Sequence, residues 1–263
     1  MRLFAQCNLS YAFPYPVEAI AKVQVLAGPD QIIVAETLAL SPGARLVTVE
    51  EAGGGRLLRG EVEGRVDIGY TATVDVGPRP PVPRDALQHR WSDLPPDTLQ
   101  YLLPSRFCPS DTFGRFVARE FGHVVDGGAR VHAVLDWIHE EVDYIHGVSD
   151  AETTAERTFV DRAGVCRDFT HLGITLCRAA NIPARAVGAY AFRLEPADFH
   201  AVMEVYVGGR WWLVDPTRLA PADGLVRIAC GRDAADIAFL TTGGAVQQIA
   251  MTVSVARLDD PGD

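Results

Sequence analysis

Apolar and polar residues alternate in short runs through the first third of the chain, and the runs are rich in Val, Ile and Thr. Gly and Pro separate these runs at GPD, SPG and GGG. Alternation with a period of two is typical of strands, and Gly and Pro indicate turns between them. Several short strands at this spacing predict a β-sandwich-like domain over residues 1–78. The predicted strands are AKVQVLA, QIIVAETLAL, ARLVTVEEA and RVDIGYTATVDV, at residues 21–27, 31–40, 44–52 and 65–76.

The segment that follows is rich in proline. GPRPPVPR, at residues 77–84, has four prolines in eight residues. This excludes a helix or a central strand, because proline has no backbone N–H group. The chain stays polar and interrupted by prolines as far as residue 110, so we predict a linker over residues 79–110.

Beyond residue 110 the apolar spacing changes to three and four residues, which marks one face of a helix. Asp111 is placed to begin a helix over residues 112–124, and a longer apolar stripe predicts another within residues 127–145. Thr153 and Glu156 have the spacing of a capping box for a third, short helix.

A fourth helix begins at Cys166, after Gly164 ends the third, and Pro183 stops it. Its residues are apolar on nearly every side, which predicts a buried central helix. Strand patterns then follow as far as residue 258. Helices first and an antiparallel sheet afterwards predict an α+β catalytic domain over residues 111–263. The predicted strands are ARAVGAYAF, HAVMEVYV, RWWLVD, GLVRIA and VQQIAMTVSVARL.

Composition narrows the class of protein. Lys and Arg number 24 against 34 Asp and Glu, a net charge of −10, which argues against a nucleic-acid partner. No apolar run approaches the roughly 18 residues of a transmembrane helix, and the first residues lack the pattern of a signal peptide. We therefore expect a cytoplasmic protein without a membrane partner; the sequence does not indicate an oligomeric state.

The cysteines do not form a recognisable framework. They are odd in number, widely scattered and without a CxxC pair, which excludes a disulfide scaffold or a zinc knuckle. They are Cys7, Cys108, Cys166, Cys177 and Cys230.

Cys166 differs from the others because it lies where a helix begins, in GVCRDFTHL. Free N–H groups and the positive end of the helix dipole favour a thiolate there, and the same N–H groups can bind an oxyanion. A lone helical cysteine is more often a packing residue, as Cys177 in mid-helix illustrates. A nucleophile also needs a base and a group that orients the base.

The hairpin HAVMEVYV-GG-RWWLVD supplies both groups. A two-residue loop at Gly208-Gly209 pairs residues whose numbers sum to 417, so Val202 faces Asp215 across the hairpin. His200 and Asp215 then lie on the same face as diagonal neighbours. A three-residue loop would place Asp215 on the opposite face. In papain-like sites a Cys at the start of a helix is followed along the chain by a His and then by an acidic or amide residue that orients the His. Cys166, His200 and Asp215 have this order.

These motifs resemble the bacterial transglutaminase-like superfamily, which includes proteins regarded as cysteine proteases. The resemblance is carried by GVCRDFTHL, NIPARAVGAYAF, DFHAVMEVYVGGRWWLVDPT, GRDAADIAF and LLPSRFCPSD. It implies a papain-like α+β core after an N-terminal β-sandwich, with Cys166 as nucleophile, His200 as base and Asp215 as the orienting acid. Val202 stands where the family has Trp, which we expect to alter the floor of the cleft.

The resulting hypothesis is a cysteine-dependent enzyme that transfers acyl groups from amide or peptide bonds. Hydrolysis is favoured over cross-linking because nothing marks a second, amine-binding site. The substrate would be a peptide or protein, and no cofactor or metal is expected, since no calcium loop is present. Two alternatives are a non-catalytic peptide-binding or scaffold protein with this fold, and a metal site made by the same three residues.

Other polar residues have simpler interpretations. Asp168 suits the first turn of the helix as a cap, and Arg167 would favour a thiolate if it points inward. His171 is five residues beyond Cys166, on a different helix face, and is not expected to be the base. Tyr144, Trp137 and residues 231–233 are candidates to line the cleft.

Overall fold

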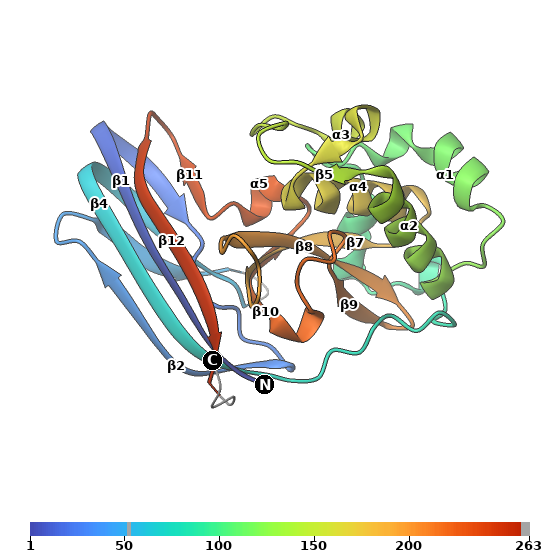
Figure 1. The fold of residues 1–263 in the computed structure, drawn as a ribbon, viewed down its shortest axis with the longest axis horizontal. Coiled ribbons are helices and arrows are strands. Elements are labelled where there is room, and N and C mark those ends of the chain that lie inside the picture. The colour runs from blue at the N-terminus through green and yellow to red at the C-terminus, as the bar shows by residue number, and fades with distance from the viewer. Residues whose placement is uncertain (52–53, 259–263) are drawn as a thin grey trace.

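Two antiparallel sheets and a group of helices make up the structure, a computed structural model that describes residues 1–51 and 54–258. In Figure 1 the first sheet stands apart on the left, the second lies in the middle, and most helices cover the second. The architecture is α+β with a strand-rich N-terminal region, as predicted. No helix among the described residues is long and apolar enough to cross a membrane.

The first sheet has six strands built around two long ones. The strands β1 and β4 pair along nearly their whole length, and each has two further partners on its other edge. Pairing of β1 with β4 is interrupted between Phe13 and Val17, where Pro14 and Pro16 cannot donate hydrogen bonds. The strands are β1 (Arg2–Ala21), β2 (Gln31–Leu40), β3 (Arg45–Glu50), β4 (Arg56–Val76), β11 (Leu240–Thr242) and β12 (Gln247–Arg257).

Two predictions for this region were wrong. AKVQVLA is not a strand, because β1 ends at Ala21 and residues 22–27 are irregular. VQQIAMTVSVARL was assigned to the catalytic domain, but its strand β12 pairs with β1, and so does β11, which was not predicted as a strand. The first sheet is therefore completed by the C-terminal part of the chain. Residue 52 of one predicted strand and residues 259–263 of the predicted catalytic domain lie outside the described residues.

The predicted linker contains two short 3₁₀ helices, η1 (Trp91–Asp93) and η2 (Pro96–Leu102), and a third, η3 (Ser110–Thr112), begins at its last residue. It lies against the second half of the chain through backbone hydrogen bonds. The carbonyl of Ala86 accepts from Gly128, and that of Leu87 accepts from Gly208. The segment is thus fixed at several points along its path.

The helices surround one buried member, α4. Every residue of α4 from Asp168 to Arg178 is buried, as the apolar pattern predicted. It packs on the second sheet and against the other helices. The helices are α1 (Gly114–Phe121), α2 (Gly128–Glu141), α3 (Ala155–Asp161), α4 (Cys166–Ala179) and α5 (Ala234–Ile237).

The second sheet has the order β10-β7-β8-β9, antiparallel throughout. Its hairpin turns at Gly208 and Gly209, both with positive φ, as a two-residue turn requires. The predicted register is confirmed from Val207–Arg210 to Met203–Val214. The strands are β7 (Ala184–Ala191), β8 (Phe199–Val207), β9 (Arg210–Val214) and β10 (Leu225–Gly231); a short parallel pair, β5 (Asp143–Tyr144) and β6 (Ala163–Gly164), precedes α4.

One hydrophobic core joins the two halves of the chain. It contains inward-facing residues of β1 and β4 together with residues of α4, β7 and β8. Tyr190 of β7 shows the connection: its hydroxyl donates to the carbonyl of Val23 at 2.7 Å, and its ring stacks on Tyr70. The first sheet is therefore packed directly on the half that carries the candidate site.

Candidate active site

Cys166 is the first residue of α4, where backbone N–H groups have no acceptor within the helix. The chain reaches it through β6, which pairs with β5, so that Tyr144 lies opposite Gly164. Asp168 fixes the turn, because its carboxylate accepts from the Val165 N–H at 2.9 Å. The thiol is half-buried and is placed at the positive end of the central helix.

His200 and Asp215 meet at the open end of the β8–β9 hairpin. The Nε2 atom of His200 lies 2.9 Å from Oδ2 of Asp215, and both side chains are almost fully buried. Asp215 also accepts from the N–H and hydroxyl groups of Thr217 and from the N–H of Ala220. These donors and His200 together hold the Asp215 carboxylate in one orientation.

These contacts set the charge of the pair. Burial would lower the pKa of His200, but the bond to Asp215 and the neighbouring Cys166 raise that pKa to about 9. Burial likewise opposes ionisation of Asp215, yet His200 and Thr217 hold its pKa below the ordinary value. The pair is therefore an imidazolium–carboxylate ion pair at neutral pH.

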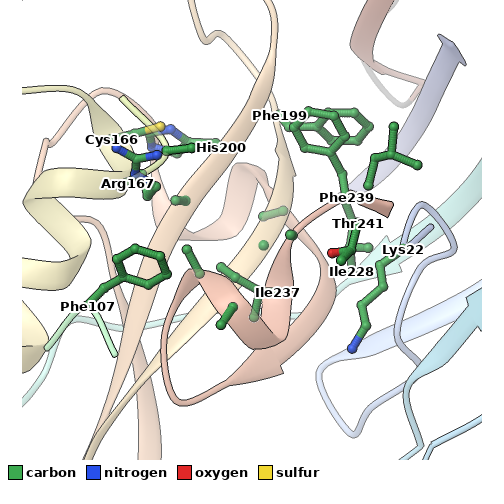
Figure 2. A pocket seen from close by; sticks show the side chains of 18 of the residues that line it. Lys22, Phe107, Cys166, Arg167, Phe199, His200, Ile228, Ile237, Phe239 and Thr241 are labelled. Atoms are coloured by element: carbon green, nitrogen blue, oxygen red, sulfur yellow. The ribbon is translucent and has the colours of Figure 1, made fainter. Parts of the chain in front are cut away.

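The other ring nitrogen of His200 faces the thiol. Nδ1 has no hydrogen-bond partner among the described residues, and the ring interacts with the side chain of Cys166. Figure 2 shows Cys166 and His200 side by side at one end of a cleft. The structure thus brings together the three residues that the sequence selected, with the acid behind the imidazole and the thiol in front.

Tyr144 lies next to the thiol as well. Its oxygen accepts from the backbone N–H of Cys166, and its hydroxyl also contacts the Cys166 side chain. Burial, and then the charge of the cysteine, raise the pKa of Tyr144 to about 12. The phenol is thus protonated at neutral pH and can donate a hydrogen bond beside the Cys166 N–H group.

The polar residues after Cys166 have separate places. Arg167 lines the cleft (Figure 2) and bonds to Asp168 and to the carbonyl of Asp150. His171 is buried away from the thiol, where its Nε2 accepts from the N–H of Ala234. Asp168 acts as a cap, and His171 is not placed to act as the base, as predicted.

The expectation for Val202 was wrong. The β8–β9 ladder ends at Met203–Val214, so Val202 does not pair with Asp215. Val202 is fully buried and packs in a cluster with Val187 and Leu213. It does not line the cleft. The alternation of side chains along the strands misplaced Val202, because the ladder stops before His200 and Asp215.

Trp137 is also absent from the cleft lining; it packs against Phe116 and Phe159. Asp233 caps α5 by accepting from Ala235. No sequence pattern indicated the apolar lining of the cleft, which comes from α5, Phe199 and residues of the first sheet. Among the described residues, no group of three or more His, Cys, Asp or Glu is arranged to hold a metal ion.

Comparison with known proteins gives concordant matches. The family model described as Transglutaminase-like superfamily matches residues 115–216. A Cytophaga hutchinsonii protein, whose crystal structure is described as a "Putative Cysteine Protease", is 39% identical. That match covers 99% of this chain and 91% of the other, with a TM-score of 0.93. An uncharacterized protein of Mycobacterium leprae (strain TN), ML0607, is 26% identical over 171 residues, which span 60% of this chain and 61% of that protein.

Proposed function

The chain belongs to the transglutaminase-like superfamily, and from the geometry of its site we propose that it is a cysteine-dependent amidase or peptidase. The observation that carries the proposal is the buried His200–Asp215 pair beside a thiol at a helix N-terminus. A packing cysteine has no need of an imidazolium in front of it. Such a pair is what activates a thiol in papain-like chemistry.

In the first step, the Cys166 thiolate, paired with the protonated His200 ring, attacks the carbonyl carbon of the amide. The new C–S bond gives a tetrahedral intermediate, whose oxygen carries the negative charge. The C–N bond then breaks, and His200 gives its proton to the leaving nitrogen. The products are a thioester on Cys166 and a free amine. Asp215 holds the ring so that Nδ1 is aimed at the thiol.

The oxyanion needs donors aimed at it before reaction. The backbone N–H of Cys166 is one, because it begins α4 and has no acceptor within the helix. The Tyr144 hydroxyl lies beside this group. Its oxygen accepts from that N–H in the free protein, and an oxyanion bound at this point would accept from both groups in its place; a single such donor is worth on the order of a hundredfold in rate.

In the second step, water attacks the thioester while His200 takes its proton. The C–S bond breaks, which releases the acid and restores the Cys166 thiolate beside protonated His200. We favour water over an amine as acceptor because, of the described residues that line the cleft, none is acidic. A lysine acceptor would gain no opposite charge there.

The proposal is tested by turnover of peptide and amide libraries with the wild type and Cys166→Ala. We expect cleavage by the wild type alone, with the acid product unchanged by added methylamine. Cleavage that survives in Cys166→Ala would exclude this nucleophile. Incorporation of methylamine in preference to water would keep the nucleophile but reassign the enzyme as a transamidase.

A further inference from the structure

A single cleft of about 580 Å³ connects the candidate nucleophile with the first sheet. Cys166 and His200 lie at one end (Figure 2), and Phe199, Phe239 and Lys22 lie at the other. The short helix α5 forms a wall between these ends through Ala234, Ala235 and Ile237. The cleft is large enough for an extended group of a substrate held at the thiol.

The strands below the cleft present very small side chains. Gly188 and Ala189 of β7 and Ala201 of β8 line it, so the sheet does not fill the space next to His200. The far end is closed by the rings of Phe199 and Phe239, which stack with centroids 4.9 Å apart. The space is therefore open near the thiol and bounded by aromatic rings farther away.

The cations that line the cleft are engaged or lie at its rim. Lys22 donates to Glu51 at 2.7 Å and to the carbonyl of Asp236 at 2.9 Å. Arg167 is bound to Asp168, and Arg106 is exposed, with its guanidinium over the Phe107 ring. A cationic group of a substrate would find no acidic residue in the described lining, and an anionic group would meet only cations that are engaged, His200 with Asp215 included, or that lie at the rim.

We infer that the cleft holds an uncharged, apolar group of the substrate beside the scissile bond, of the size of an aromatic or branched aliphatic side chain. The inference rests on the proposed function and assigns its substrate class. Burial of such a group against aliphatic and aromatic walls favours binding in proportion to the apolar area removed from water. The first sheet contributes to this preference, because Leu240 and Thr241 of β11 line the far end.

The test uses iodoacetamides with different groups on the amide nitrogen, because each forms the same S–C bond at a thiol and releases iodide. The reagents are iodoacetamide itself and its N-benzyl, N-carboxymethyl and N-(2-aminoethyl) derivatives. Rates of alkylation at Cys166 are measured by peptide mass spectrometry and divided by the rates with glutathione. We expect the benzyl reagent to exceed both charged reagents by about tenfold or more.

Ala238 offers a matched variant, since it lines the cleft after α5. In Ala238→Glu the benzyl preference should fall, and the ammonium reagent should gain roughly threefold or more from the new carboxylate. Ala118→Glu, on the exposed side of α1, adds the same charge elsewhere and should keep the wild-type ratios. A loss of structure would not selectively raise the rate with the ammonium reagent. A gain for that reagent therefore indicates that residue 238 contacts it in the cleft.

Equal normalised rates for all four reagents in the wild type would overturn the inference, whatever the variants do. The proposed function fails by a different result: plain iodoacetamide alkylating Cys166 no faster than the buried Cys177. The ratio of the rates with different reagents tests the proposed preference of the cleft. The rate with plain iodoacetamide tests whether Cys166 is a reactive thiol.

Discussion

The protonation state of His200 depends on two neighbours, Asp215 and Cys166, which raise its pKa while burial lowers it. The ring is 2% exposed, and a buried imidazole without a partner would be neutral at pH 7. Asp215, fixed by Thr217 and Ala220, reverses this. The proton that the leaving amine needs is thus in place before the substrate arrives.

This charge state predicts how turnover depends on pH. The pKa of His200 is about 9, so the ring is protonated below that pH and loses its proton above it. Amide turnover should fall as pH rises through about 9, because the leaving amine then lacks a proton donor. Alkylation of Cys166 by iodoacetamide needs no acid and should not fall there. Stopped assays over pH 6–10.5 compare the rate of amide turnover with the rate of alkylation. If both rates fall together above about pH 9, His200 is not the proton donor to the amine.

Tyr144 can be tested separately from the triad. Tyr144→Phe removes the hydroxyl beside the Cys166 N–H and should lower kcat about a hundredfold with little change in KM. Tyr101→Phe is the control, because that ring packs on Trp211 away from the thiol. Steady-state kinetics of both variants suffice. An unchanged kcat in Tyr144→Phe would leave the backbone N–H as the oxyanion donor.

At this scale the sequence located Cys166, His200 and Asp215 because local geometry relates them. A helix start exposes the thiol, and a two-residue turn sets the face of the hairpin. Tyr144 could not be assigned, because its place depends on the pairing of β5 with β6 across α3. The predicted pairing of Val202 with Asp215 was wrong because the pairing of β8 with β9 ends at Met203–Val214. Contacts distant in the sequence decide where such pairing ends.

The helix α5 shows how an element of the cleft depends on contacts outside itself. Four residues cannot form a stable helix alone. Asp233 caps it and also accepts from the N–H of Phe107, while His171 of α4 accepts from the N–H of Ala234. The ring of His171 stacks on Phe107 at 5.1 Å. The wall of the cleft is thus bonded to α4, the helix that begins at Cys166.

The bond from Ala234 requires a neutral His171, and burial lowers its pKa from 6.5 to about 4. Between these values the unfolded chain binds a proton that the native chain does not, so the free energy of unfolding should fall as pH drops. The loss approaches about 3 kcal/mol for one such group. Urea unfolding from pH 7 to pH 4 measures it.

His171→Gln keeps an acceptor without titrating, so its free energy of unfolding should depend less steeply on pH over this range. His123→Gln, at an exposed histidine, should retain the wild-type dependence. If His171→Gln and the wild type have the same slope, protonation of His171 does not destabilise the fold.

Among the elements, those defined by local periodicity were predicted and those defined by distant partners were not. The segment Gln31–Leu40 and the hairpin of β8 and β9 have clear alternation and turn residues. The strand pattern of β12 is equally clear, but alternation does not say which sheet a strand joins. It pairs with β1, about 240 residues away along the chain.

On the scale of the whole molecule, an ion-pair network fastens the first sheet to the second. Arg227 of β10 bonds Asp30, just before β2, at 2.7 Å, and Glu204 of β8 at 2.9 Å. Arg185 of β7 also bonds Glu204, and Arg79 of the linker bonds Asp30. The network and the core around Tyr190 make the strand-rich region part of the unit that carries the site.

Glu204→Gln tests this connection. The carboxylate is 2% exposed and lies between two guanidinium groups. Its neutralisation should lower the free energy of unfolding by about 3 kcal/mol, because Arg185 loses its carboxylate partner while Arg227 keeps only Asp30. Glu61→Gln breaks an exposed pair with Arg45 and should cost less than about 1 kcal/mol. Equal, small costs in denaturant unfolding would mean that the network contributes little.

In the proposed reaction Cys166 carries an acyl group during turnover. Mixing the protein with the p-nitrophenyl ester of 3-phenylpropanoic acid and quenching in acid allows intact mass spectrometry to detect that intermediate. We predict one acyl group, mapped to the peptide containing Cys166, removed by hydroxylamine and absent in Cys166→Ala. An acyl group on another residue, or ester turnover undiminished in Cys166→Ala, would contradict the claim.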